Sequence, residues 1–150
     1  MTGKSLSTNK VTHIGLIVRD VEKMAAKYAE MFGVEVPRIG LTGAAEETRI
    51  SFKGKTTSAR AKLVHLDFGS VRIELIEPVG GPSVWQEFLD ARGECIHHVG
   101  IHSNKPEEDI AFLKGKSMGI VQQGEYPGGM YIYFDTEREL GFSLELLRKT

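Results

Sequence analysis

Hydrophobic residues recur along the chain with two different spacings. From Val21 to Phe32 an apolar residue returns every three or four positions, which predicts a helix that Asp20 can cap and Gly33 can end. Two further stretches have the same helical spacing, at residues 81–92 and 106–114. The chain is therefore expected to contain at least three helices.

The flanking residues of the two later helices indicate how they begin and what they cover. Ser103 or Asn104 can cap the last helix. The helix at 81–92 places Trp85 and Phe88 on one face, so we expect it to pack against a sheet and to link the two halves of the chain.

Short stretches rich in β-branched and aromatic residues predict strands. They cover residues 12–18, 33–38, 60–68, 71–77, 97–103, 119–123, 130–134 and 142–147. Taken in order with the helices, they give each half of the chain the sequence strand, helix, strand, strand, strand.

The two halves also repeat short sequences. Thr-His-Ile-Gly-Leu around His13 returns as His-His-Val-Gly-Ile around His98. Arg-Ile-Glu-Leu-Ile around Glu74 returns as Ser-Leu-Glu-Leu-Leu around Glu145. The repeat thus pairs His13 with His98 and Glu74 with Glu145.

These patterns predict one α+β domain made of two βαβββ modules. We expect a polar N-terminal tail at 1–10, a first module at 11–80, a linker helix at 81–93 and a second module at 94–150. The histidine-to-glutamate interval is longer in the first half, which indicates an insertion near 42–58. This insertion lacks a sustained apolar period, so we expect a long loop.

Composition excludes several classes of protein. The 150 residues carry a net charge of −1, and the basic residues are scattered, so nucleic acid is not an expected partner. No apolar run approaches the roughly 20 residues of a membrane span, and the first ten residues resemble no signal peptide, so a cytoplasmic protein without membrane contact is expected. Cys95 is the single cysteine and is expected to be a small, partly buried residue.

Two histidines and two glutamates stand out on the predicted strands. Because side chains alternate along a strand, His13 and His98 project away from the apolar face that packs on the helices. Glu74 and Glu145 each interrupt an apolar strand, where a carboxylate is costly unless it is paired or bound to a metal. A single strand histidine is more often structural and a single glutamate more often solvated. The repeat that places all four together favours a site for a divalent transition metal.

Other residues compete for roles at this site. His97 is expected on the opposite side of its strand from His98, outside the site. His65 and His102 have no counterpart in the repeat and are expected to be structural or surface residues. Glu77 is expected to be exposed, and Tyr131 and Tyr133 are expected to pack in the core, although both could line the cavity.

At these motifs the chain resembles the vicinal oxygen chelate superfamily, which includes glyoxalase I, methylmalonyl-CoA epimerase, extradiol dioxygenases and bleomycin-resistance proteins. The resemblance runs from about Val11 to Leu147 and is strongest to the epimerase-like branch. It implies two βαβββ modules whose mixed sheet curls around one divalent ion, Zn, Co, Mn, Ni or Fe(II), often in a homodimer. The implied metal ligands are His13, Glu74, His98 and Glu145.

The chain departs from the epimerase pattern at two positions. Epimerases carry a proton-transferring glutamate on the third strand of the first module, where this sequence has Ala61. They also tend to have glutamine where this chain has Glu74, whereas some glyoxalases have glutamate there. If the insertion folds over the site, Glu46 or Glu47 could supply the missing base.

The resemblance implies a metal-dependent epimerase or isomerase that moves a proton next to a carbonyl. The expected substrate is a small molecule with two neighbouring oxygens, and an acyl-CoA is the first to try. Glu145 is the best candidate for a ligand that also exchanges protons, and Glu74 is second. A glyoxalase I-type lyase acting on lactoylglutathione and a non-catalytic binding or resistance protein are the alternatives. An iron dioxygenase fits less well, because its triad has only three protein ligands.

Overall fold

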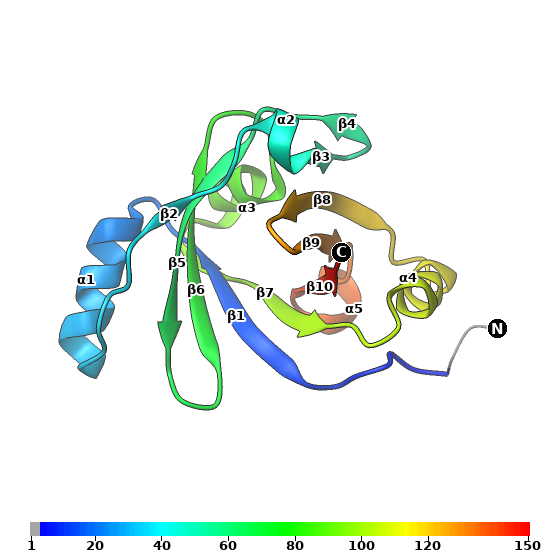
Figure 1. Cartoon of the computed structure of the whole chain (residues 1–150), viewed down its shortest axis with the longest axis horizontal. Helices are drawn as coiled ribbons and strands as arrows, with labels where there is room; N and C mark the ends of the chain where they lie inside the picture. Colours follow the sequence, from blue (N-terminus) through cyan, green and yellow to red (C-terminus); the bar gives the residue numbers. More distant parts are fainter. Residues whose placement is uncertain (1–3) are drawn as a thin grey trace.

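Two antiparallel strands, β1 (Val11–Ile17) and β7 (Cys95–His102), lie side by side at the centre of the sheet. The structure is a computed structural model, which describes residues 4–150. On one side β1 pairs in parallel with β6 (Arg72–Val79), and on the other side β7 pairs in parallel with β10 (Ser143–Lys149). The same arrangement is therefore built twice, once from each half of the chain (Figure 1).

Ten strands form one curled mixed sheet in the order β2-β5-β6-β1-β7-β10-β9-β8-β3-β4. The remaining strands are β2 (Gly40–Leu41), β3 (Ser51–Phe52), β4 (Lys55–Thr56), β5 (Arg60–Asp67), β8 (Ile120–Tyr126) and β9 (Gly129–Phe134). The helices are α1 (Val21–Phe32), α2 (Ala45–Thr48), α3 (Val84–Arg92), α4 (Pro106–Gly115) and α5 (Glu137–Leu140). The predicted α+β fold with two strand-helix-strand-strand-strand halves is confirmed.

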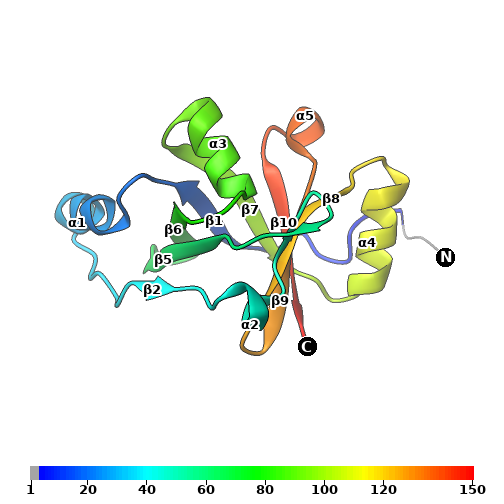
Figure 2. The same ribbon diagram turned by 90° about the horizontal axis from the view of Figure 1, so that it is seen from above.

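The helix α1 begins and ends as its sequence predicts. The Asp20 carboxylate accepts a hydrogen bond from the Lys23 amide at 3.0 Å, and Gly33 adopts a left-handed conformation with φ of 66°. Val21 and Ala25 are fully buried against β5 and β6. In Figure 2, α1 and α4 lie at opposite ends of the molecule, each beside its own half of the sheet.

The start of α4 differs from the prediction. Lys105 is the capping residue and no side chain caps the helix, so the prediction of Ser103 or Asn104 is wrong. The Ser103 hydroxyl is engaged instead by the buried Asp109 carboxylate, which also accepts a hydrogen bond from the Ser7 amide at 2.7 Å. Asp109 thereby fixes the N-terminal segment against the second half of the chain.

The predicted strand at 33–38 is wrong. Only the two residues of β2 join the sheet in this region. Pro37 has no N–H to donate to a neighbouring strand, and Val36 is exposed, so little burial stabilises an extended pairing here.

The segment at 42–58 is not the structureless loop that its composition predicts. It contains α2 and the hairpin β3–β4, and β3 pairs antiparallel with β8 in the other half of the chain. Ile50 and Phe52 are buried and anchor the segment. Figure 1 shows α2, β3 and β4 reaching from β5 across to β8, so the insertion ties the two halves together.

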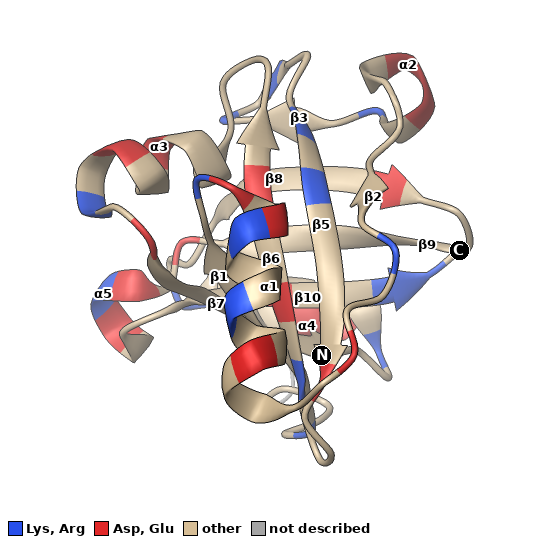
Figure 3. Ribbon diagram, turned by 90° about the vertical axis from the view of Figure 1, so that its left-hand side faces the viewer, with Lys and Arg blue, Asp and Glu red and all other residues tan. Residues whose placement is uncertain are grey.

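The linker helix α3 packs as predicted. The Ser83 hydroxyl accepts from the Gln86 amide at 3.0 Å, and Trp85, Phe88 and Leu89 are buried. Among residues 4–150, no helix is both long and apolar enough to cross a membrane. Acidic and basic residues are interspersed along α1 and α5 in Figure 3, in keeping with the net charge of −1.

Candidate metal centre

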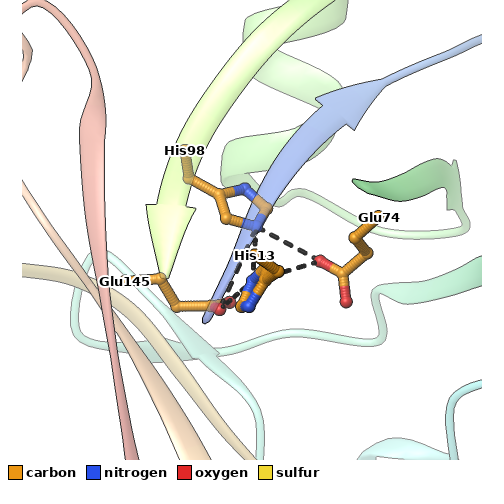
Figure 4. A group of neighbouring side chains, drawn as sticks. All are labelled: His13, Glu74, His98 and Glu145. Carbon is orange, nitrogen blue, oxygen red and sulfur yellow. Dashed lines mark hydrogen bonds and ion pairs between the residues drawn. The ribbon is translucent and has the colours of Figure 1, made fainter. Parts of the chain in front are cut away.

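Four buried side chains converge where the two halves meet. His13 projects from β1, Glu74 from β6, His98 from β7 and Glu145 from β10 (Figure 4). One nitrogen or carboxylate oxygen from each lies within 4.8 Å of the others. The structure therefore brings together all four residues that the repeat singles out.

The pairing of the central strands explains this convergence. His13 is the Cα partner of Gly100, and His98 is the Cα partner of Gly15. Each imidazole lies over the glycine of the other half, and a Cβ on Gly15 would stand 2.0 Å from the Cε1 atom of His98. The equivalent distance from Gly100 to His13 is 2.1 Å. The His-x-Gly spacing in each half is thus a packing requirement of the site.

The spacing of the donor atoms fits a divalent ion. His13 Nε2 lies 2.8 Å from Glu145 Oε1, His98 Nε2 lies 3.2 Å from Glu74 Oε1, and the two Nε2 atoms are 3.3 Å apart. The two longer histidine–glutamate separations are 3.8 and 3.9 Å. Ligands that each bind an ion at about 2.1 Å are separated from one another by about 3–4 Å, depending on the bond angle. Two imidazoles and two carboxylates also form a donor set that such ions accept.

Hydrogen bonds on the far side of His13 orient its ring for this role. The Thr12 hydroxyl donates its proton to the Gly100 carbonyl at 3.1 Å, so it can only accept from His13 Nδ1, which is also 3.1 Å away. The proton of the neutral ring therefore sits on Nδ1. The lone pair on Nε2 faces Glu74 and Glu145, as metal binding requires.

His97 supports His98 in the same way. As predicted, it is not one of the four converging residues, but its ring contacts His98 instead of facing away from it. Gly15 pairs with His98, and the next residue, Leu16, pairs with Ile96, so the pairing skips His97 and forms a β-bulge. Because of this bulge, the consecutive residues His97 and His98 can both be buried. The Nδ1 atoms of His97 and His98 are 2.9 Å apart. Burial and the neighbouring His98 hold the pKa of His97 well below its usual range, so His97 is neutral and can accept the His98 Nδ1 proton.

His65 was expected to be a structural or surface residue, and the structure corrects this. Its Nε2 atom lies 2.6 Å from Glu74 Oε2, so it holds the carboxylate oxygen that does not face His98. A sequence signal for this contact exists. The tight turn between Phe68 and Val71 sets the register of β5 and β6, and that register places His65 directly opposite Glu74.

The electrostatics of the cluster reflect these contacts. Burial alone would lower the pKa of His13, but in the protonated ring Nε2 donates to Glu145, and this bond and the charges of Glu145 and Glu74 outweigh burial and raise the pKa. Burial would raise the pKa of Glu74, but the contacts of its carboxylate with His65 and His98 outweigh burial and lower it strongly. Without an ion, the Glu74 carboxylate is thus stabilised as an anion by the neighbouring imidazoles.

His13, Glu74 and Glu145 form part of the wall of a cavity of about 940 Å³, while His98 is fully buried and does not line it. Glu47 of α2 lines this cavity and Glu46 does not, while Ala61 is fully buried behind the wall. Tyr131 and Tyr133 also line it, so they serve both the core and the cavity. His102 lies on the cavity wall as well, but it is not one of the four converging residues.

A second group of carboxylates lies at the start of α1. Asp20 and Glu22 are exposed, while Glu77 is half-buried and accepts a hydrogen bond from the Val21 amide at 2.9 Å. The prediction that Glu77 is exposed is therefore wrong, because this carboxylate satisfies a free amide at the helix N-terminus.

Residues 12–134 match the family described as the Glyoxalase/Bleomycin resistance protein/Dioxygenase superfamily. The chain is 25% identical over 133 residues to the uncharacterized protein YqjC of Bacillus subtilis, covering 87% of this chain and 85% of that one. It is 24% identical over 119 residues to human mitochondrial methylmalonyl-CoA epimerase, covering 79% of this chain and 60% of that one.

Solved structures share the fold at lower identity. A hypothetical protein from Bacillus halodurans superposes with a TM-score of 0.67 and 22% identity, covering 94% of both chains. Methylmalonyl-CoA epimerase from Mycobacterium tuberculosis superposes with a TM-score of 0.66 and 18% identity, covering 100% of this chain and 93% of that one. The sequence match over residues 12–134, together with this shared fold, shows that the chain belongs to the glyoxalase/bleomycin resistance/dioxygenase superfamily.

Proposed function

We propose that this chain is a metal-dependent epimerase or isomerase that moves a proton next to a carbonyl group. An acyl-CoA thioester related to methylmalonyl-CoA is the first substrate to test. The observation that carries the proposal is the convergence of two imidazoles and two carboxylates with suitable spacing, of which His13, Glu74 and Glu145 line one cavity. The similarity to human methylmalonyl-CoA epimerase adds weaker support.

The ligands of the ion in this proposal are His13, Glu74, His98 and Glu145. When bound, a divalent ion (Zn, Co, Mn, Ni or Fe(II)) would supply a positive charge that attracts two neighbouring substrate oxygens and stabilises negative charge developing on them. The buried imidazoles are oriented toward it by Thr12 and His97.

The two glutamates differ in their freedom to carry a proton. Both oxygens of Glu74 are engaged, Oε1 by His98 at 3.2 Å and Oε2 by His65 at 2.6 Å. Glu145 contacts the histidines through Oε1, and no hydrogen bond or ion pair from residues 4–150 engages its Oε2. Glu145 is therefore the better base, since its second oxygen is available to a proton on the substrate carbon.

An epimerase also benefits from a second proton-transferring group on the other side of the substrate. Ala61 cannot serve, because it has no ionisable group and is fully buried. Glu47 is exposed and lines the cavity from α2, so we assign it this role in preference to Glu46. Removal of residues 42–58 without loss of turnover would exclude this assignment.

Solvent exchange tests the reaction directly. We expect the metal-loaded protein to incorporate deuterium from D₂O into methylmalonyl-CoA, and the Glu145→Gln variant to lose most of this exchange. Metal analysis of the wild type beside a His98→Ala, Glu145→Ala double variant is the matching control for the site. Metal-loaded wild type that exchanges no deuterium with this or related thioesters would refute the epimerase proposal.

A glyoxalase I-type lyase remains the second candidate, favoured by glutamate rather than glutamine at position 74. The hemithioacetal of glutathione and a 2-oxoaldehyde is the substrate that tests it, with lactoylglutathione as the product. A folded wild type that binds no divalent ion would favour a ligand-binding or resistance role for the cavity instead.

The proposal also includes a homodimer in the cytoplasm. Met31 and Phe32 are 78% and 61% exposed at the end of α1, and Val36 is exposed close by in the sequence. Apolar side chains exposed together are typical of a contact surface. Light scattering during size-exclusion chromatography would give the mass, and a monomer would contradict this part of the proposal.

A further inference from the structure

Arg72 stands on the cavity wall beside the candidate metal centre. It lies two residues before Glu74 on β6, so both side chains project from the same face of the sheet. Its Cα partner on β1 is His13. Arg72 is therefore next to two of the four converging residues, one along its own strand and one across the sheet.

The positive charge of Arg72 has no partner within the described protein. Two arginines line the cavity, Arg49 and Arg72. Arg49 pairs with Glu125, with Nε 3.2 Å from Oε2. Arg72 forms no ion pair or side-chain hydrogen bond with any residue from 4 to 150, although Asp67 is its Cα partner on β5.

Arg72 also lies where the main cavity adjoins a smaller hollow. This second hollow has a volume of about 540 Å³ and is lined by the segment after α1 and by the β5–β6 turn. His65 and Arg72 line both spaces. Because Nε2 of His65 is committed to Glu74, Arg72 is the unpaired donor group at this junction.

The net charge of the proposed centre indicates what Arg72 binds. Two glutamates and a divalent ion sum to zero, so a substrate that brings a carboxylate adds a negative charge to a neutral site. An unpaired guanidinium beside the centre can neutralise this charge and bind a carboxylate through two parallel hydrogen bonds. A neutral acyl group would leave Arg72 without a partner.

We propose that Arg72 forms an anion subsite that binds a carboxylate of the substrate and makes the site prefer acyl thioesters whose acyl group carries a second carboxylate. The inference rests on the proposed function for the position of the thioester at the centre. The anion bound is the substrate carboxylate rather than a phosphate of CoA, since Arg72 is adjacent to His13 and Glu74.

Calorimetric binding to the metal-loaded protein tests this subsite, with malonate, malonyl-CoA and acetyl-CoA as probes. Malonyl-CoA carries the extra carboxylate, acetyl-CoA lacks it, and both carry the CoA phosphates. Loss of a charge-assisted hydrogen-bonded pair predicts that Arg72→Met weakens malonate and malonyl-CoA binding about 10- to 100-fold and leaves acetyl-CoA unchanged. Arg72→Lys should restore part of the loss.

Lys62→Met is the matched control, because Lys62 lies on β5, pairs with Glu77 at 3.8 Å and does not line the cavity. It removes one positive charge and should leave all three affinities unchanged. Metal content and Tm, measured for each variant, establish that the centre and the fold are intact. Since Arg72 is exposed, both should match the wild type.

The outcomes separate the subsite from the proposed function. Equal weakening of acetyl-CoA and malonyl-CoA by Arg72→Met would overturn the subsite and assign Arg72 to the CoA phosphates. Wild type that does not bind malonate, or Arg72→Met that binds it as tightly, would also overturn it. Malonate binding that depends on Arg72, with no binding of either thioester, would support the subsite and refute the acyl-CoA proposal.

Discussion

Gly15 offers a sharp test of how the centre is built. A Cβ added there would lie 2.0, 2.2 and 2.6 Å from Cε1, Nε2 and Nδ1 of His98. The backbone of Gly15 is not left-handed, so alanine suits its conformation, and the three atoms nearest to the added Cβ all belong to the imidazole of His98. His98 is fully buried and held by His97 and Glu74, so its ring has little room to retreat.

The size of the effect follows from these distances. Carbon atoms pack at about 3.5 Å, so the ring must move by about 1.5 Å, and overpacking of this kind costs roughly 1–3 kcal/mol. In a domain of this size such a loss lowers Tm by about 2–12 °C. This movement is a large fraction of a metal–nitrogen bond length of about 2.1 Å, so Nε2 of His98 would no longer lie at bonding distance from the ion. We therefore expect metal affinity to fall by at least about tenfold, the lower end of what misoriented ligands cost.

A double-mutant cycle separates this clash from a general loss of stability. In the His98→Ala background the imidazole is gone, and Gly15→Ala should then be neutral or stabilise by up to about 1 kcal/mol through reduced chain entropy. Gly119→Ala is the control, because no atom lies within 4 Å of a Cβ at that position. Urea unfolding gives the free energies and metal titration gives the affinities. An equal cost of Gly15→Ala in both backgrounds would refute the reasoning.

Four further outcomes follow from the same geometry. His65→Ala should weaken metal binding about 10- to 100-fold while leaving a folded protein, because Glu74 loses the partner on its second oxygen; metal titration beside circular dichroism would detect this, and unchanged affinity would contradict it. Glu145→Gln should reduce turnover far more than Glu74→Gln reduces it at saturating metal, since no residue from 4 to 150 engages Oε2 of Glu145; equal losses in steady-state assays would argue against Glu145 as the base. The raised pKa of His13 means that its protonated ring stabilises the metal-free protein below pH 6.5, and this contribution is lost as pH rises through the raised pKa. The lowered pKa of Glu74 means that its carboxylate stabilises the metal-free protein above pH 4.5, and this contribution is lost as pH falls through the lowered pKa. Both contributions are therefore present together between about pH 4.5 and 6.5. Protons compete with the ion for His13, so the gain in Tm on adding metal should grow from about pH 6 to pH 8 and vanish with a chelator; a gain that shrinks with rising pH would contradict this.

The sequence predicts the four converging residues because a repeat carries information about register. Once His13 corresponds to His98 and each is followed two residues later by glycine, the pairing of the central strands is nearly determined, since only glycine leaves room for the opposing ring. The helix α1 is predictable for a similar local reason, because Asp20 and Gly33 mark its ends.

Features that depend on contacts between distant segments are not predictable in this way. The bulge that keeps His97 beside His98 arises from the pairing of β7 with β1, and alternation along one strand places His97 on the wrong side. The elements within residues 42–58 are only two to four residues long, too short for a period to be recognised. Their stability comes from pairing with β8, which lies about 70 residues later in the chain.

The crossed arrangement of rings and glycines also bears on the order in which the protein becomes functional. Each imidazole lies on a glycine that belongs to the opposite half, and each half supplies only two of the four converging side chains, so neither half can assemble the whole centre by itself. During synthesis β1 cannot pair with β7 until β7 has been made. Pairings between segments so far apart in sequence form slowly, on the order of milliseconds to seconds. Ion binding would therefore report completion of the native topology, and a truncated first half would emerge with β1 as an unpaired edge open to association with other chains.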